Sequence, residues 1–161
     1  MRIITVKDGK MNLVSYVEEG DNKTVQSKDP AAPEWDEAFR NLALDIKTCL
    51  ANQLNVATAL RDAFIQAHSV TVNKVHFNYE DDEDTPSTYD VYGHHSIAET
   101  NYDTDVKLTF EFGNSNAPDA GAIAVLKEGK KYALNHRAQV SLFEDAEINR
   151  IMNNGGDKNE E

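Results

Sequence analysis

Residues 33–50 have the sequence PEWDEAFRNLALDIKTCL. This stretch carries the strongest helical pattern in the chain, and the predicted fold is built around it. Its large apolar residues recur at steps of three and four, the spacing of one face of an α-helix. They are Trp35, Phe39, Leu42, Ile46, Cys49 and Leu50. Pro33 suits a helix start, and Asp36 and Glu37 complement the helix dipole. The stretch therefore predicts a long amphipathic helix in which Cys49 is a small buried side chain.

The N-terminal residues are rich in β-forming side chains. Residues 3–6 and 13–17 flank Asp8-Gly9, a dipeptide that tolerates positive φ, and this arrangement predicts a β-hairpin. Residues 18–33 are polar and contain Gly and Pro, so we expect a loop. A short strand over 24–27 is the one regular element that this loop could hold.

Further β segments follow the helix. Residues 70–79 change their apolar parity near Asn73-Lys74, as a β-bulge would cause. Residues 106–112 alternate strictly between apolar and polar side chains, which is typical of a strand with one buried face. We expect two short antiparallel strands between these segments, over residues 89–92 and 95–100.

Two more helical segments are expected. Residues 56–67 carry an apolar face. Its members are Val56, Leu60, Phe64 and Ala67. Residues 119–134 form a moderate helix weakened by Gly121 and Gly129. Because strands and helices are grouped rather than alternating, the predicted class is α+β: an antiparallel sheet with an N-terminal hairpin, backed by one long amphipathic helix and a C-terminal helix.

The predicted organisation is one α+β domain with a C-terminal extension. The domain covers residues 1–135, a docking peptide or short helix covers 136–150, and a disordered acidic tail covers 151–161. A chain of 161 residues is long enough for one core. Its single cysteine excludes an intramolecular disulfide, and no apolar run has the length of a membrane span. We therefore expect a reduced, soluble protein of the cytoplasm with no membrane partner and no cofactor.

Acidic residues dominate the charge. The formal net charge is -12, which disfavours simple coating of nucleic acid. Residues 79–105 contain nine acids and neither Lys nor Arg. The densest run is Glu80, Asp81, Asp82, Glu83 and Asp84. A solvated hairpin loop is the favoured interpretation. A hard-cation site and a surface that imitates the charge of a nucleic-acid backbone are the functional alternatives, and the pattern of an EF-hand is absent from the sequence.

Two patterns invite a catalytic interpretation, and neither is favoured. Adjacent residues in a strand point to opposite faces, so His94 and His95 are not expected to converge on one metal ion. Asp90, Asp105 and Lys107 loosely resemble the carboxylates and lysine of metal-dependent nucleases. Lys107 is more simply the solvent-facing residue of an alternating strand. We predict no catalytic centre and no metal site.

A short peptide near the C-terminus gives the most specific functional signal. Gln139-Val140-Ser141-Leu142-Phe143 resembles the pentapeptide by which bacterial DNA-metabolic proteins dock on the sliding clamp, and it matches every constrained position. Leu142 and Phe143 would enter a groove, Gln139 would fix the register, and Ser141 occupies the Ser or Asp position. The alternative is a terminal amphipathic helix, packed on the domain through residues that include Ile148 and Ile151.

A wider pattern of residues agrees with this signal. The order of a hairpin, PEWDEAFRNLA at 33–43, VTVNKVHFNY at 70–79 and YALNHRAQ at 132–139 resembles a group of uncharacterised phage and prophage early proteins. Members of that group tend to end in Arg-Ala-Gln, two variable positions and Leu-Phe, and their genes accompany replication and recombination functions. The helix at 56–67 is longer here than its counterpart in the group. The resemblance implies a genomic context rather than a mechanism.

The combined hypothesis is a non-catalytic accessory protein of phage or prophage DNA metabolism, which docks on the host sliding clamp. One alternative is a single-stranded DNA-binding or annealing protein with an acidic tail. Its basic contacts would be Lys127, Lys130, Lys131 and Arg137. A second alternative is an acidic decoy, which inhibits a host DNA-binding or defence protein through residues 80–84.

Overall fold

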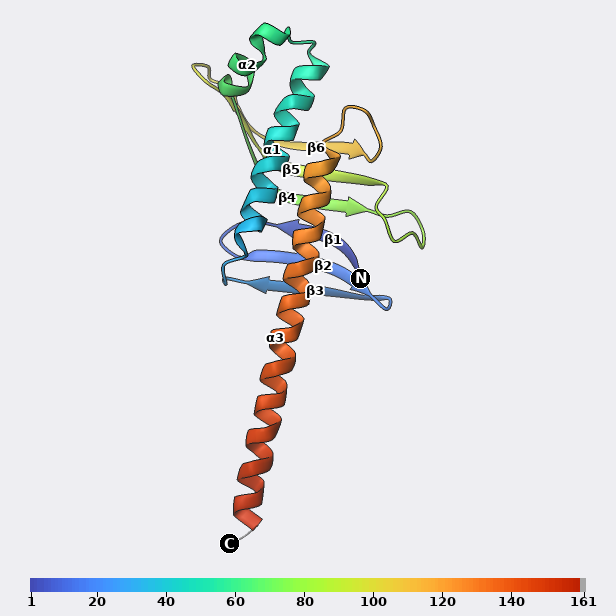
Figure 1. Cartoon of the computed structure of the whole chain (residues 1–161), viewed down its shortest axis with the longest axis vertical. Helices are drawn as coiled ribbons and strands as arrows, with labels where there is room; N and C mark the ends of the chain where they lie inside the picture. Colours follow the sequence, from blue (N-terminus) through green and yellow to red (C-terminus); the bar gives the residue numbers. More distant parts are fainter. Residues whose placement is uncertain (160–161) are drawn as a thin grey trace.

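A computed structural model of the chain describes residues 1–159, with side chains described over 1–136 and 147–152. Within this part, six antiparallel strands form one sheet in the order β3-β2-β1-β4-β5-β6 (Figure 1). The strands are β1 (Arg2–Lys7), β2 (Asn12–Glu18), β3 (Asp21–Ser27), β4 (His68–Asn78), β5 (Thr88–Ile97) and β6 (Asp103–Glu111). The α+β class and the N-terminal hairpin of β1 and β2 are confirmed.

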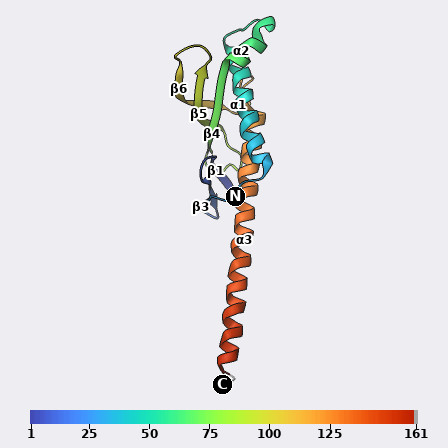
Figure 2. The same cartoon turned by 90° about the vertical axis from the view of Figure 1, so that its left-hand side faces the viewer.

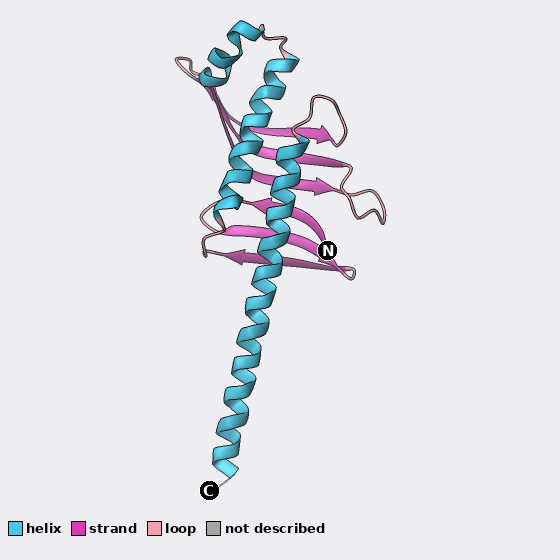
Figure 3. Cartoon of the chain, viewed as in Figure 1, coloured by secondary structure: helices cyan, strands magenta, loops and turns pink. Residues whose placement is uncertain are grey.

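Helices cover one face of this sheet. They are α1 (Pro33–Gln53), the 3-10 turn η1 (Thr58–Leu60), α2 (Arg61–Ala67) and α3 (Asp119–Asn159). Figure 2 shows α1 and α3 on the same side of the sheet, and Figure 3 shows both crossing the strands. No helix in the described part of the chain is long and apolar enough to cross a membrane.

The sheet consists of two three-stranded meanders, β3-β2-β1 and β4-β5-β6, which meet where β1 pairs with β4. This seam is short, because it joins Thr5, Val6 and Lys7 to residues 74–76 of β4. The register of β4 against β5 shifts between Val72 and Lys74, so the β-bulge predicted near Asn73-Lys74 is confirmed.

The core lies between the sheet and the two long helices. Trp35 and Leu42 of α1 are buried, together with Val6, Val75 and Phe77 from the strands. The indole of Trp35 donates a hydrogen bond from Nε1 to Asp8 Oδ1 at 3.1 Å, so its polar atom is also satisfied. The apolar stripe from Trp35 to Ile46 is therefore the core face of α1, as the sequence predicts, whereas Cys49 and Leu50 at its end are only partly buried.

Two glycines bring α3 close to its neighbours. A Cβ on Gly129 would lie 2.4 Å from Val6 Cγ2, and a Cβ on Gly121 would lie 2.8 Å from Leu42 Cα. Both separations are shorter than van der Waals contact, so any larger residue at these positions would force its neighbours to move. In the sequence these residues indicate a weak helix. In the structure they are packing positions, because the absent side chain lets the helix contact β1 and α1.

Several predicted boundaries differ from the observed ones. The expected loop over 18–33 contains a full strand, β3, which pairs with β2 along its length. The two short strands expected over 89–92 and 95–100 are one strand, β5. The reason is Gly93. A Cβ at this position would lie 1.9 Å from Thr71 O, so a residue without a side chain lets β4 and β5 continue to pair past the bulge.

The last two helices also differ from expectation. The expected helix over 56–67 is replaced by η1 and α2, which together cover residues 58–67, and Leu60 is 61% exposed instead of facing the core. Helix α3 does not end near residue 134 but continues to Asn159. Polar composition alone does not end a helix, and residues 130–154 contain neither Gly nor Pro. The expected tail at 151–161 overlaps this helix, and residues 160–161 lie outside the described part.

Candidate functional site

The outer face of the sheet, opposite the helices, carries the proposed nuclease residues. Asp90 Oδ1 accepts a hydrogen bond from Thr109 Oγ1 at 2.6 Å, and Oδ2 accepts one from Asn78 Nδ2 at 3.4 Å. Burial alone would raise the pKa of Asp90, but these two hydrogen bonds, with the charge of Lys107, hold it below its usual value. Asp90 is therefore an ionised carboxylate that its neighbours hold in place.

The strand register separates the two carboxylates of this pattern. Asp90 lies opposite Thr109, whereas Asp105 lies opposite His94, which is four residues further along β5. At 3.3 Å per residue the two backbone positions are about 13 Å apart. Lys107 is exposed and points over the ring of Tyr92, with its Nζ 5.6 Å from the ring centroid. The backbone register therefore does not bring both carboxylates to one magnesium ion.

The two adjacent histidines point to opposite faces, as predicted. His94 lies on the outer face, where hydrogen bonds with Asp105 and then Asp103 raise its pKa. His95 lies on the inner face, and its Nε2 is 2.8 Å from His68 Nδ1. Among the described residues, no group of three or more His, Cys, Asp or Glu side chains could hold a metal ion.

The charged candidates lie at separate places on the surface. The acids at residues 80–84 are all exposed, in the turn between β4 and β5. Lys127, Lys130 and Lys131 are exposed on α3, where spacings of three and four place them on one side of the helix. Lys131 Nζ forms an ion pair with Glu128 Oε1 at 3.1 Å. The side chain of Arg137 lies outside the described residues.

The pentapeptide at 139–143 lies within α3, so its backbone is helical. The side chains of Gln139, Ser141, Leu142 and Phe143 lie outside the described residues. Figures 1 and 2 show that this half of α3 extends past the sheet, and that no other element of the described chain runs beside it. Further along, Ile148 is 54% and Ile151 is 60% exposed. These two side chains do not pack on the domain.

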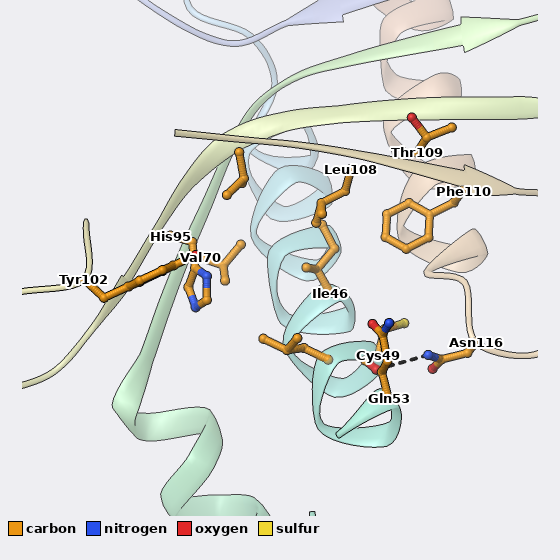
Figure 4. A pocket seen from close by; sticks show the side chains of 12 residues that line it. Ile46, Cys49, Gln53, Val70, His95, Tyr102, Leu108, Thr109, Phe110 and Asn116 are labelled. Carbon is orange, nitrogen blue, oxygen red and sulfur yellow. Dashed lines mark hydrogen bonds between the residues drawn. The ribbon is translucent and has the colours of Figure 1, made fainter. Parts of the chain in front are cut away.

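A feature that the sequence did not reveal is a pocket of about 440 Å³ between α1 and the β6 edge of the sheet (Figure 4). Ile46 and Leu50 of α1 line one side, and Leu108 and Phe110 of β6 line the other. The inward side chains of β6 are half-buried, whereas Val75 of β4 is fully buried under the helices. The pocket therefore exists because helical cover is incomplete over β6.

A row of aromatic rings leads to this pocket. The ring of Phe64 stacks on that of His68 at 4.0 Å, His68 stacks on His95 at 5.1 Å, and Tyr102 meets His95 edge-on at 5.0 Å. Burial lowers the pKa values of both histidines. The charge of Lys47 lowers the pKa of His68 further, and the charges of His68 and His94 lower the pKa of His95 further. Both imidazoles are therefore neutral at neutral pH.

The cysteine beside the pocket is not an activated nucleophile. Burial raises the pKa of the Cys49 thiol, and the charges of Asp45 and Asp119 raise it further. Its backbone carbonyl accepts a hydrogen bond from Asn116 Nδ2 at 3.1 Å. The thiol is therefore protonated at neutral pH, although Cys49 is only partly buried and not the buried side chain that its place on the apolar stripe predicts.

Comparisons with known protein families, with curated protein sequences and with solved structures find no match to this chain. The alternation in β6 predicted which side chains face inward, but no sequence signal showed that α1 leaves them partly uncovered. The pocket forms from residues far apart in sequence, so only the tertiary arrangement could reveal it.

Proposed function

We propose that the protein is a non-catalytic accessory protein of phage or prophage DNA replication or recombination, acting in the host cytoplasm, and that it docks on the bacterial sliding clamp through residues 139–143. The observation that carries the proposal is the place of the pentapeptide. It matches the clamp-docking pattern at every constrained position, and it lies on the half of α3 that extends past the sheet.

Docking as an extended peptide, the mode in which backbone hydrogen bonds add to the side-chain contacts, requires this segment to leave the helical conformation that it has in α3. Helices in proteins gain most of their stability from packing, and the extending half of α3 has no neighbouring element within residues 1–159. Opening its backbone therefore costs little free energy. The exposure of Ile148 and Ile151 supports this, since burial does not hold the helix on the domain.

The expected affinity follows from the two apolar side chains. Burying Leu142 and Phe143 in a groove contributes roughly 3 to 6 kcal/mol. The amide of Gln139 both donates and accepts hydrogen bonds, which fixes the register of the peptide. Ordering of the segment opposes these gains, so we expect a Kd near micromolar, which corresponds to about -8 kcal/mol.

Calorimetric titration of the whole chain against purified bacterial clamp tests the proposal. We expect the double variant Leu142→Ala/Phe143→Ala to weaken binding by about tenfold or more. The matched control is Ile148→Ala/Ile151→Ala, which removes two exposed apolar side chains from the same helix outside the motif. Equal binding by the wild type and the Leu142/Phe143 variant refutes the assigned peptide.

A second candidate function is single-stranded DNA binding, which the lysines exposed on one side of α3 favour. The same preparations distinguish it from clamp docking. Salt-sensitive oligonucleotide binding that is lost in Lys127→Ala/Lys130→Ala/Lys131→Ala, without clamp binding, would replace the first proposal by the second.

A further inference from the structure

The pocket between α1 and β6 has the dimensions of a ligand site. Its volume of about 440 Å³ lies within the range of roughly 300 to 1,000 Å³ that is usual for small-molecule pockets. Its walls are regular elements, with Ile46 of α1 facing Leu108 and Phe110 of β6 across the space (Figure 4). Such walls are largely preformed, so a ligand would enter without having to order a loop.

The pocket is also free of charge, although charged residues make up 27% of the chain. None of its twelve described lining residues is Asp, Glu, Lys or Arg. His95 is the one titratable imidazole among them, and its lowered pKa keeps it neutral at neutral pH. The groups around it are His68 on β4, the Tyr102 ring and the adjacent His94. An ionised ligand would find no counter-charge here, which makes its burial costly.

His95 and Tyr102 lie at one side of the pocket, whereas Gln53 and Asn116 lie at the other (Figure 4). His95 Nε2 is engaged by His68, whereas His95 Nδ1 has no hydrogen-bond partner within the described part of the chain. Within the described part of the chain, the Tyr102 hydroxyl and the Gln53 side-chain amide also have no hydrogen-bond partner. Tyr102 is 44% exposed and extends the row of aromatic rings toward solvent. These groups offer hydrogen bonds to a ligand whose ring contacts the aliphatic walls.

We propose that this pocket binds a neutral aromatic small molecule that carries one hydroxyl or carbonyl group. The ring lies between the α1 and β6 walls, and the polar group lies toward His95 and Tyr102. The absence of charge on all lining residues selects a neutral molecule, and the aromatic rings beside the walls favour an aromatic one. This site does not involve α3 beyond the sheet, so it is independent of clamp docking.

A pair of matched probes tests the class of ligand. 1-Naphthol is neutral at pH 7 and carries one hydroxyl, whereas 1-naphthoate has the same ring system and a negative charge. Titration of the whole chain with each probe, followed by calorimetry, should give saturable binding of one 1-naphthol per chain. We expect 1-naphthoate to bind more weakly by about tenfold or more. Equal binding of the two probes, or no saturable binding of 1-naphthol, overturns the proposal.

Variants locate the binding. Leu108→Trp fills the pocket and should abolish 1-naphthol binding, whereas Leu44→Trp adds the same ring at an exposed position of α1 outside the pocket. Tyr102→Ala provides a second test, because an exposed residue can be truncated without loss of the fold, and it should weaken binding by about tenfold. Leu44→Trp should bind 1-naphthol like the wild type. If Leu108→Trp or Tyr102→Ala also binds it like the wild type, the proposal is wrong.

Discussion

The middle of the sheet and its β6 edge present the same kind of inner face and bury it differently. At the seam of β1 and β4, Val6 and Val75 are fully buried beneath α1 and α3. At the β6 edge, Leu108 and Phe110 are half-buried and line an open pocket. Both regions have alternating strands. Alternation therefore determines which side chains point inward, and helix placement determines whether they become a core or a pocket.

The largest expected effect compares a leucine of the core, on α1, with a leucine of the pocket, on β6. Leu42→Ala, at a fully buried position, should lower the free energy of unfolding by about 2 to 5 kcal/mol. Leu108→Ala should cost only about 1 kcal/mol, because its side chain already faces an open pocket. Urea unfolding followed by circular dichroism measures both values. Equal losses would mean that the β6 edge is packed as tightly as the core.

A smaller effect is expected where α3 meets β1. Gly129→Ala places a Cβ against Val6, a stiff and fully buried side chain, and such overpacking costs about 1 to 3 kcal/mol. Alanine recovers about 1 kcal/mol through its helix propensity, so a net loss of about 1 kcal/mol remains. The control is Gly9→Ala, whose Cβ has its nearest contact at an ordinary 3.8 Å. A stabilised Gly129→Ala protein would contradict the close approach of the helix.

The smallest effect concerns pH at the pocket. Burial keeps His68 and His95 neutral in the folded protein, with pKa values below the ordinary 6.5. As the pH falls below 6.5, the unfolded chain binds protons that the folded chain does not, so these two residues lower stability. The variant His68→Phe/His95→Phe should therefore lose less stability than the wild type between pH 7 and pH 5, measured by thermal unfolding.

His94 provides a control of opposite sign for the pH prediction. Its pKa is raised by Asp105 and Asp103, so its contribution to stability is complete below pH 6.5 and is lost as the pH rises through its folded value. Removing it by His94→Gln should make the acid loss larger, not smaller. If both variants change the acid response in the same direction, the assignment of the two histidines to different environments is wrong.

Local sequence patterns predicted much of the fold. The three- and four-residue steps from Trp35 to Leu50 identified α1, and the change of parity at Asn73-Lys74 identified the bulge of β4. These signals arise from contacts within one element or one strand pair. The role of Gly93 could not be predicted, because the atom that leaves no room for a side chain there is the carbonyl oxygen of Thr71 on the neighbouring strand.

The candidate sites divide in the same way. The opposite directions of His94 and His95 follow from strand geometry alone, so the sequence predicted them correctly. The pocket needs α1, β4, β5 and β6 together, and no single segment carries its signal. The docking role of residues 139–143 is a property of a partner as well as of this chain, and it stays a prediction.

The contact of Val6 with Gly129 has a consequence for folding during synthesis. The ribosome delivers β1 and β2 first, and they can pair at once because their contacts are local. The apolar side of this hairpin stays uncovered at this stage, because α1 and residue 129 of α3 are synthesised later. The nascent chain therefore exposes an unfinished apolar surface until residue 129 has been synthesised, which is when a chaperone would be needed most.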